Sequence, residues 1–313
     1  MSIATSKFNI VKLLLNKSIF DENIITIILQ YYWNILDCKK KNLLNWINIK
    51  KLNWRFLSSN SNTIDLLKEN QDKLCWSSLS KDPNAIDLLK ENQDKIHWRI
   101  FCFNPNPNAI QLLKENKDKI HWKWLSQNQN PNAINLLKQN KDKICWSGLS
   151  CNPNAIHLLK QNKDKIVWEM LSCNPNAIEL LKANQDKIDW TGLSCNPNAI
   201  ELLKANQDKI DWPGLSCNPN AINLLRERIE YENSLTTEEL DEIYYEYKID
   251  WEFLSKNPNA IELLKQNQDK IYWKRLSVNP NAIELLKENK DKIYWYKLSS
   301  NPAIFEDEPM PII

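Results

Sequence analysis

The residues best suited to metal binding or acid–base chemistry are few and poorly spaced for it. The chain has three histidines. His97 and His121 occupy one position in neighbouring copies of a repeated motif, and His157 occupies a different one. A His-x-x-x-His pair, which would place two ring nitrogens on one helix face for zinc, does not occur in the sequence. We therefore expect these histidines at the surface or at helix starts, and predict no metal and no cofactor.

Eight cysteines could suggest disulfides or a thiolate metal site. Four of them recur at one position of successive repeats: Cys151, Cys173, Cys195 and Cys217. Equivalent positions in stacked helices lie about 9–10 Å apart, whereas the Cα atoms of a disulfide lie within about 7 Å. Zinc–sulfur bonds are shorter still, at about 2.3 Å. The spacing predicts reduced thiols in a cytosolic-type compartment.

Tryptophan and lysine recur with the same period and could form a nucleic-acid surface. A Trp returns every 22 residues from Trp54, with intervals of 24 after Trp98 and Trp122 and one of 39 after Trp212. Such a column could stack bases, and lysine columns could follow phosphates. However, the Trp keeps the period of the apolar core residues, and an Asp precedes each Lys of the second column. We expect a buried Trp and a solvated charged face, and the formal net charge of +2 argues against nucleic acid as the partner.

The element that positions these residues is a 22-residue repeat. In residues 174–195, an Asn-Pro start predicts a helix with one apolar face that ends at Asn184, where we expect the left-handed conformation. Pro213 directly follows a Trp, and proline fits only the first helical turn. A second, shorter helix is therefore predicted to start at each Trp, with Asp189 or its equivalent as N-cap. A start one turn earlier, at the Asp of Asp-Lys-Ile, stays open.

Helices this short are marginal alone in water, so each repeat must bury its apolar face against the next. The sequence predicts an all-α fold, an elongated α-solenoid of about ten short two-helix repeats. Residues 1–50 are interpreted as a helical N-terminal cap, 51–304 as the array and 305–313 as an acidic C-terminal tail. An insert at 226–249 interrupts the array. Its Thr-x-x-Glu capping box predicts a helix over residues 237–247.

Composition and motifs limit the class of function. The chain has only 3 glycines, and its sequence holds no phosphate loop, dinucleotide fingerprint, nucleophile elbow or His-Glu-x-x-His motif. We therefore expect no enzyme and no small-molecule substrate. No apolar run approaches the roughly 20 residues that span a membrane, and no signal peptide is visible. We expect a cytoplasmic protein, in a host cell or a virion, that is not secreted and does not enter a membrane.

Residues that vary between otherwise fixed repeats are the candidates for partner binding, because solenoids present extended surfaces. In the Trp-led helices these are Trp124, Glu169, Met170, Lys274, Arg275, Tyr296 and Lys297, and in the insert they are Tyr244, Tyr245 and Tyr247. Of these, Trp124 is expected to be exposed. We expect a non-enzymatic scaffold that mediates protein–protein interaction with an unknown host or viral protein.

The repeating unit Leu-Ser-x-Asn-Pro-Asn-Ala-Ile-x-Leu-Leu-Lys-x-Asn-x-Asp-Lys-Ile-x-Trp covers residues 52–306. It resembles the short tandem repeats of giant nucleocytoplasmic DNA viruses of the mimivirus-like group. The resemblance implies a viral origin and an α-helical repeat fold, and it brings no catalytic residues. The insert at 226–249 departs from the pattern, as does Gln or Lys where related units often carry Pro before the Asp.

A second resemblance lies near the N-terminus. Residues 19–29, Ile-Phe-Asp-Glu-Asn-Ile-Ile-Thr-Ile-Ile-Leu, are similar to the start of an F-box, without its usual Leu-Pro opening. This implies a different function, that of a substrate adaptor that joins a host ubiquitin ligase through residues 1–50. A virion structural component and a nucleic-acid-binding repeat protein also remain open as functions of the array.

Overall fold

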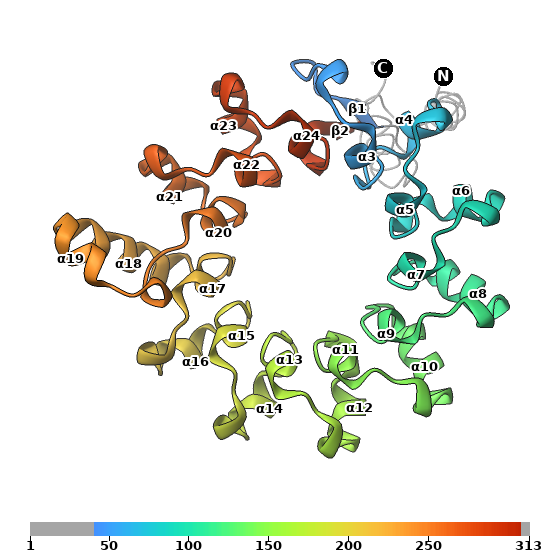
Figure 1. The fold of residues 1–313 in the computed structure, drawn as a ribbon, viewed down its shortest axis with the longest axis horizontal. Helices are drawn as coiled ribbons and strands as arrows, with labels where there is room; N and C mark the ends of the chain where they lie inside the picture. Colours follow the sequence, from blue (N-terminus) through green and yellow to red (C-terminus); the bar gives the residue numbers. More distant parts are fainter. Residues whose placement is uncertain (1–40, 308–313) are drawn as a thin grey trace, which may run out of the picture.

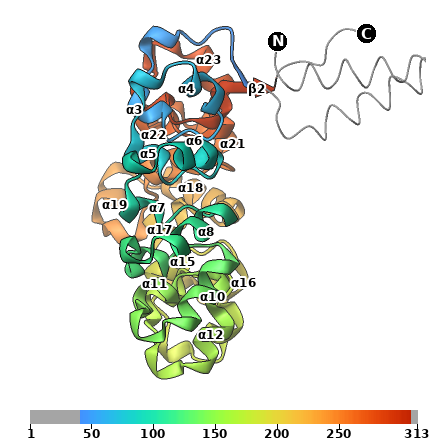
Figure 2. The same ribbon diagram turned by 90° about the vertical axis from the view of Figure 1, so that its right-hand side faces the viewer.

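The repeats close on themselves to form a ring. The structure is a computed structural model that describes residues 41–307. Figure 1 shows two concentric circles of short helices, and Figure 2 shows the same ring from its edge. The prediction of an all-α solenoid of short two-helix repeats is confirmed. The expected elongated shape is wrong, because the last repeat contacts the first.

The inner circle consists of the Trp-led helices, each of which begins at the repeating Trp as predicted. The N-cap carboxylate of Asp189 accepts a hydrogen bond from the Gly192 N–H at 2.7 Å. Pro213 occupies the first turn of its helix, where no N–H is needed. The interpretation with an earlier start is therefore wrong. The inner helices are α3 (Trp54–Leu57), α5 (Trp76–Leu79), α7 (Trp98–Phe101), α9 (Trp122–Leu125), α11 (Trp146–Ser150), α13 (Trp168–Ser172), α15 (Trp190–Ser194), α17 (Trp212–Ser216), α20 (Trp251–Lys256), α22 (Trp273–Leu276) and α24 (Trp295–Leu298).

The outer circle consists of the helices at the Pro-Asn-Ala-Ile sequences, which Ser61-Asn62-Thr63-Ile64 replaces in the first repeat. In two repeats the helix starts at the Pro and runs for nine residues, as predicted. In the others, Pro-Asn-Ala forms a separate turn and the helix starts at the Ile. The outer helices are α4 (Ile64–Lys68), α6 (Ile86–Glu91), α8 (Pro107–Glu115), α10 (Pro131–Gln139), α12 (Ile156–Gln161), α14 (Ile178–Lys182), α16 (Ile200–Lys204), α18 (Ile222–Ser234), α21 (Ile261–Gln266) and α23 (Ile283–Glu288).

The C-terminal end of each outer helix differs from the prediction. Asn184 has φ −142° and ψ 55°, so it is not left-handed. Its side-chain Nδ2 instead donates to the Leu180 carbonyl at 2.8 Å and satisfies a carbonyl that the helix end leaves free. The Gln/Lys-Asp-Lys segment that follows forms a 3-10 turn, which the repeat pattern did not predict.

The 3-10 turns fall into two groups. Those before the inner helices are η1 (Ile49–Lys51), η2 (Gln71–Lys73), η4 (Gln93–Lys95), η5 (Lys117–Lys119), η6 (Lys141–Lys143), η8 (Lys163–Lys165), η9 (Gln185–Lys187), η10 (Gln207–Lys209), η12 (Gln268–Lys270) and η14 (Lys290–Lys292). Those at Pro-led sequences are η3 (Pro83–Ala85), η7 (Pro153–Ala155), η13 (Pro280–Ala282) and η15 (Pro302–Ile304).

Neighbouring repeats are joined by buried polar side chains as well as by the apolar core. Asn196 is fully buried, and its Nδ2 donates to the carbonyls of Ser172 and Asn174, both at 2.9 Å. The Ser172 hydroxyl donates to the Trp168 carbonyl at 2.9 Å and accepts the Asp189 N–H at 3.0 Å. These polar groups are buried at little cost because each has partners. The same Asn and Ser recur around the ring.

The junction that closes the ring uses the same bonds. The Nδ2 of Asn60 donates to the carbonyls of Ser299 and Asn301, at 3.3 and 2.9 Å. The Ser299 hydroxyl accepts the Asn53 N–H at 2.8 Å. The two ends of the described chain therefore meet as two ordinary neighbouring repeats do.

An eleventh unit is shared between those two ends. Residues 301–304 supply its Asn-Pro start, and residues 44–54 supply its second half, up to the first inner helix. Beside it, β1 (Lys41–Leu43) pairs antiparallel with β2 (Phe305–Asp307). The two ends of the described chain are thus two halves of one closing unit.

The structure of both terminal segments differs from the prediction because of this closure. The helical pattern expected over 43–49 does not form a helix, because these residues contribute to β1 and to the shared unit. The start of the acidic tail forms β2. The rest of the predicted N-terminal cap, including the F-box-like residues 19–29, and the tail beyond 307 lie outside the described residues.

The insert extends the outer circle. It lengthens α18 to Ser234 and adds α19 (Thr237–Glu242), which lies at the periphery in Figure 1. The capping box forms as predicted, with both of its hydrogen bonds. The helix ends at Glu242 rather than near residue 247. A 3-10 turn, η11 (Tyr245–Tyr247), follows it and leads back to the inner circle. Buried Glu232 holds this return by accepting the Ile249 N–H at 2.9 Å.

Candidate functional site

Three positions of each inner segment face the opening of the ring. Residues in a helix advance by about 100° each, so positions 1, 4 and 5, counted from the Trp, share one side and positions 2, 3 and 6 share the other. The residues at positions 4 and 5 are fully buried between the two circles. Positions 2, 3 and 6 therefore lie on the side of each inner helix away from the outer circle, and we call them the inner face. Figure 1 shows that this side of the inner circle borders the opening.

The inner face is a continuous band of side chains. Position 3 of one helix contacts position 2 or 6 of the preceding helix. The Trp124 ring lies 4.5 Å from the Phe103 ring and 5.1 Å from the Arg99 guanidinium, both on the preceding repeat. Arg275 likewise pairs with Glu252 at 2.6 Å. Many side chains at position 2 remain exposed, so the opening is accessible to solvent.

Seven of the ten predicted binding residues lie on the inner face. Position 2 holds Glu169, Lys274 and Tyr296, and position 3 holds Trp124, Met170, Arg275 and Lys297. Variability between repeats was the only reason to select them, and the ring brings them onto one surface. Trp124 is only half-exposed, because it packs into the neighbouring repeat, and its Nε1 is buried without a hydrogen bond.

The three tyrosines of the insert lie apart from the inner face. Tyr244, Tyr245 and Tyr247 are 74%, 63% and 43% exposed, in or beside η11. The Tyr245 hydroxyl donates to the carboxylate of Asp250, the N-cap of α20, and this raises the pKa of Tyr245 to about 12. The structure does not join this tyrosine group to the other candidates.

An aromatic cluster spans the closing junction. The rings of Phe56 and Tyr296 lie 5.8 Å apart, and Tyr294 lies edge-on to Tyr296 at 6.3 Å. The Lys297 ammonium lies 5.1 Å from the Phe56 ring centroid. Phe56 and Tyr294 were missed as candidates. Only the closure brings Phe56 to Tyr296, whereas Tyr294 precedes the repeating Trp, at a position that was not considered for partner binding.

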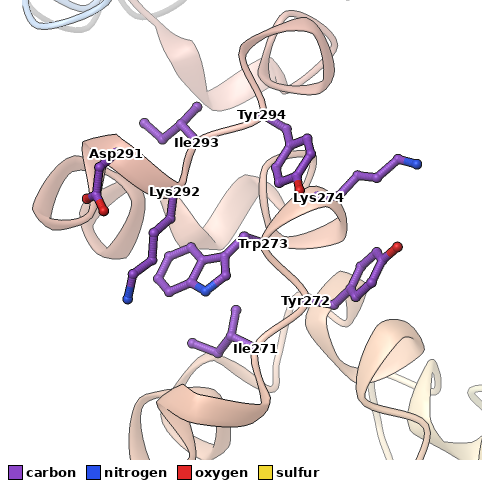
Figure 3. Close-up of a pocket in the computed structure, with 8 residues that line it drawn as sticks. All are labelled: Ile271, Tyr272, Trp273, Lys274, Asp291, Lys292, Ile293 and Tyr294. Atoms are coloured by element: carbon purple, nitrogen blue, oxygen red, sulfur yellow. The ribbon is translucent and has the colours of Figure 1, made fainter.

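A pocket of about 470 Å³ lies beside this cluster, between α22 and α24. Figure 3 shows Tyr272, Lys274 and Tyr294 on one side of the chain trace and Trp273 with Lys292 on the other. Tyr272 and Tyr294 are 40% and 44% exposed. The pocket therefore combines aromatic walls with the ammonium groups of Lys274 and Lys292 and the carboxylate of Asp291.

Charge divides the inner segments, taken from the N-cap to position 6, into two halves. Six consecutive helices across the closure, from α22 through α24 and α3 to α9, carry basic residues and no acidic ones: Lys274, Arg275, Lys297, Arg55, Lys81, Arg99 and Lys123. Of the other five, α11 carries no charged residue, and α13, α15, α17 and α20 carry acidic residues with one base, Lys256: Glu169, Asp189, Asp211, Asp250 and Glu252. We call these the basic half and the acidic half.

No family model matches the chain, and no curated protein or solved structure is similar to it.

The acidic half shows the electrostatic effect of its own charges. The pKa of Asp211 is raised mainly by burial and further by the carboxylates of Asp189 and Glu246. The pKa of Cys173 is also raised, first by burial and then by Asp189. Part of this charge has a structural role, because Asp189, Asp211 and Asp250 cap inner helices.

The tryptophan column is less buried than expected. Each repeating Trp is half-buried, and in most repeats a Lys from the next repeat covers its open ring face, as Lys187 does over Trp168 at 4.9 Å. Lys51 lies over Trp295 at 4.7 Å in the same way across the closure. Two other lysines of this column pair with the preceding Asp, at 3.2 and 3.3 Å. The second lysine column thus mainly covers indoles, a role that the sequence pattern did not reveal.

The thiols and histidines have structural positions. The described cysteines are all free. A hydrogen bond between the Cys195 and Cys217 thiols of neighbouring repeats lowers the pKa of Cys217 and raises that of Cys195. His97 is an N-cap, as expected, with its Nδ1 3.4 Å from the Ile100 N–H. Within residues 41–307, no three potential ligands converge to hold a metal ion, and no helix has the length and apolarity to cross a membrane.

Proposed function

We propose that this protein is a non-enzymatic scaffold that binds another protein on the inner face of its ring. The observation that carries the proposal is that different positions of the repeat have different roles. The recurring Asn, Ser and Leu side chains are buried and form the contacts between repeats, whereas positions 2, 3 and 6 vary and lie on the side of the opening.

The size and chemistry of the inner face suit a polypeptide. Eleven described helices at about 9–10 Å spacing, each roughly 10–12 Å wide with side chains, leave an opening of about 20 Å. A helix or an extended segment fits such an opening. Tyr, Trp and Arg, the residues that most often dominate protein interfaces, occur on this face at Tyr296, Trp124 and Arg275. The resemblance to giant-virus repeats supports a viral scaffold that acts on a host or viral protein.

The test is an affinity capture from infected-cell lysate with the full chain. One variant carries Lys274→Ala, Tyr296→Ala and Lys297→Ala on the inner face. The matched control carries Lys138→Ala and Lys160→Ala, both exposed on outer helices. We expect the inner-face variant to lose the captured protein and the control to keep it. Equal capture by both variants would contradict binding on the inner face.

A further inference from the structure

We propose that the basic half of the inner face binds an acidic segment of a partner protein that also carries apolar side chains, with the Tyr272–Tyr294 pocket as its anchor point. This inference rests on the proposed function and adds the chemistry of the partner. It follows from three features of the inner face: its charges, its aromatic groups and the spacing of its cations.

The first feature is charge without compensation. Among residues 41–307, Arg275 is the only one of the seven basic residues that forms an ion pair, with Glu252 at the border of the acidic half. Arg55, Arg99 and Lys123 are exposed. Like charges gathered on one concave surface raise the local potential and attract an acidic partner.

The second feature is the apolar surface between these charges. Tyr272 and Tyr294 are exposed beside Lys274 at the pocket, and Tyr296 continues the same surface to Phe56. Aromatic rings give a large contact area at a low cost in side-chain entropy. A partner side chain that is apolar would fill the pocket, while a neighbouring carboxylate meets the Lys274 ammonium.

The third feature separates a peptide from a nucleic acid. Seven cations spread over six helices, spaced about 9–10 Å apart, give roughly one positive charge per 8–10 Å. An extended peptide advances about 3.3 Å per residue, so this spacing matches an acidic residue at every second or third position. A duplex carries one phosphate charge per about 1.7 Å of its helix axis, or one per about 3.4 Å for each strand. The basic half is therefore too sparse to neutralise the backbone of a duplex.

The acidic half restricts where the segment lies. Glu169, at position 2 of α13, faces the opening from the opposite half of the ring, and like charges that approach within a Debye length of about 8–10 Å repel each other. An acidic segment is thus confined to the half that contains the closing junction. A basic segment would bind the other half instead.

The test measures fluorescence anisotropy with the full chain and three labelled probes. The first is a 20-residue peptide design with Glu at about every third position and Leu and Tyr between, the second has Lys in place of Glu, and the third is oligothymidine of about the same length. The variant is Lys274→Glu with Lys297→Glu. The control, Lys138→Glu with Lys160→Glu on outer helices, changes net charge equally.

We expect the acidic peptide to bind best, with an affinity that falls as salt rises. The inner-face variant should lose at least about tenfold in affinity, which is 1.4 kcal/mol, while the control binds as the parent does. Thermal melts verify that both variants fold. Equal binding of the acidic peptide by variant and control, its failure to bind, or preferential binding of oligothymidine would overturn the inference. If the alanine variant still loses its captured protein in that case, the scaffold function stands without the acidic partner.

Discussion

Asp82 interrupts the ladder of buried asparagines that joins the repeats, and its replacement by Asn should stabilise the ring. At the equivalent position, Asn104 donates its Nδ2 to the carbonyls of Ser80 and Asp82, at 3.2 and 2.9 Å. A carboxylate at position 82 has no N–H with which to donate hydrogen bonds to the carbonyls of the preceding repeat. Asp82 is only 4% exposed, and its Oδ2 has no hydrogen-bond partner. The ring therefore contains one junction with an unsatisfied buried acceptor.

The size of the effect follows from the bonds involved. A buried polar atom left without a partner costs about 1–3 kcal/mol, and each regained hydrogen bond contributes about 1 kcal/mol. Asp82→Asn should therefore stabilise the protein by about 2–4 kcal/mol at neutral pH. Burial raises the pKa of Asp82. The loss of folding stability caused by the Asp82 carboxylate is therefore absent below the ordinary pKa of Asp and grows as pH rises toward and through the raised pKa. The stability gained by Asp82→Asn should accordingly shrink on acidification.

The assay compares thermal unfolding of parent and Asp82→Asn at pH 7 and near pH 4. We expect a higher midpoint at pH 7, by about 2–4 °C per kcal/mol, and slower hydrogen exchange over residues 58–85. Asn174→Asp is the mirror-image control and should lower stability, because that Asn donates two bonds of 2.9 Å. An unchanged midpoint at pH 7, or a gain that does not depend on pH, would refute the reasoning.

Three further outcomes can be checked. Gly192→Ala should lower the unfolding midpoint, because the new Cβ would lie 2.8 Å from the Cys173 Sγ and overpacking costs about 1–3 kcal/mol; a higher midpoint would contradict this close approach. Deletion of residues 301–313 should open the ring and increase the maximum dimension measured by X-ray scattering, whereas an unchanged dimension would count against closure. A hydrogen bond from the Cys195 thiol lowers the pKa of Cys217 and raises that of Cys195, so iodoacetamide at pH 7.5 should alkylate Cys217 faster than Cys195, as mass spectrometry would show. Equal alkylation rates would contradict the shared bond.

The local structure of the repeat was predictable because single residues determine it. Asp189 caps the inner helix and Pro213 restricts its start, both through effects that act within one turn. The end of the outer helix was mispredicted, since the side chain of Asn184 satisfies a carbonyl without the left-handed conformation. The conformation of Asn184 depends on this hydrogen bond rather than on the backbone preference of asparagine, so the residue type alone did not predict it.

The ring itself could not be derived from the repeat. Closure by eleven units needs a rotation of about 33° per repeat, and no single residue encodes that angle. The sequence did contain a sign of the closing unit, because Asn48 and Lys51 lie at the same distance before Trp54 as the Asn and Lys of complete repeats lie before their Trp. Variability identified seven residues of the inner face, but contacts across the closure, such as Phe56 with Tyr296, join residues that lie far apart in the sequence.

Closure also explains why variation is concentrated on one surface. In an open solenoid, a repeat with a changed twist alters only the overall curvature. In a ring, the same change would separate Asn60 from Ser299 and Asn301 and leave buried polar groups without partners. Residues that set the geometry between repeats are therefore constrained in every unit at once. Exposed inner-face side chains, such as Arg55, Lys123 and Glu169 at position 2, can change without altering the rotation, so a closed ring can diversify its binding surface while its framework stays fixed.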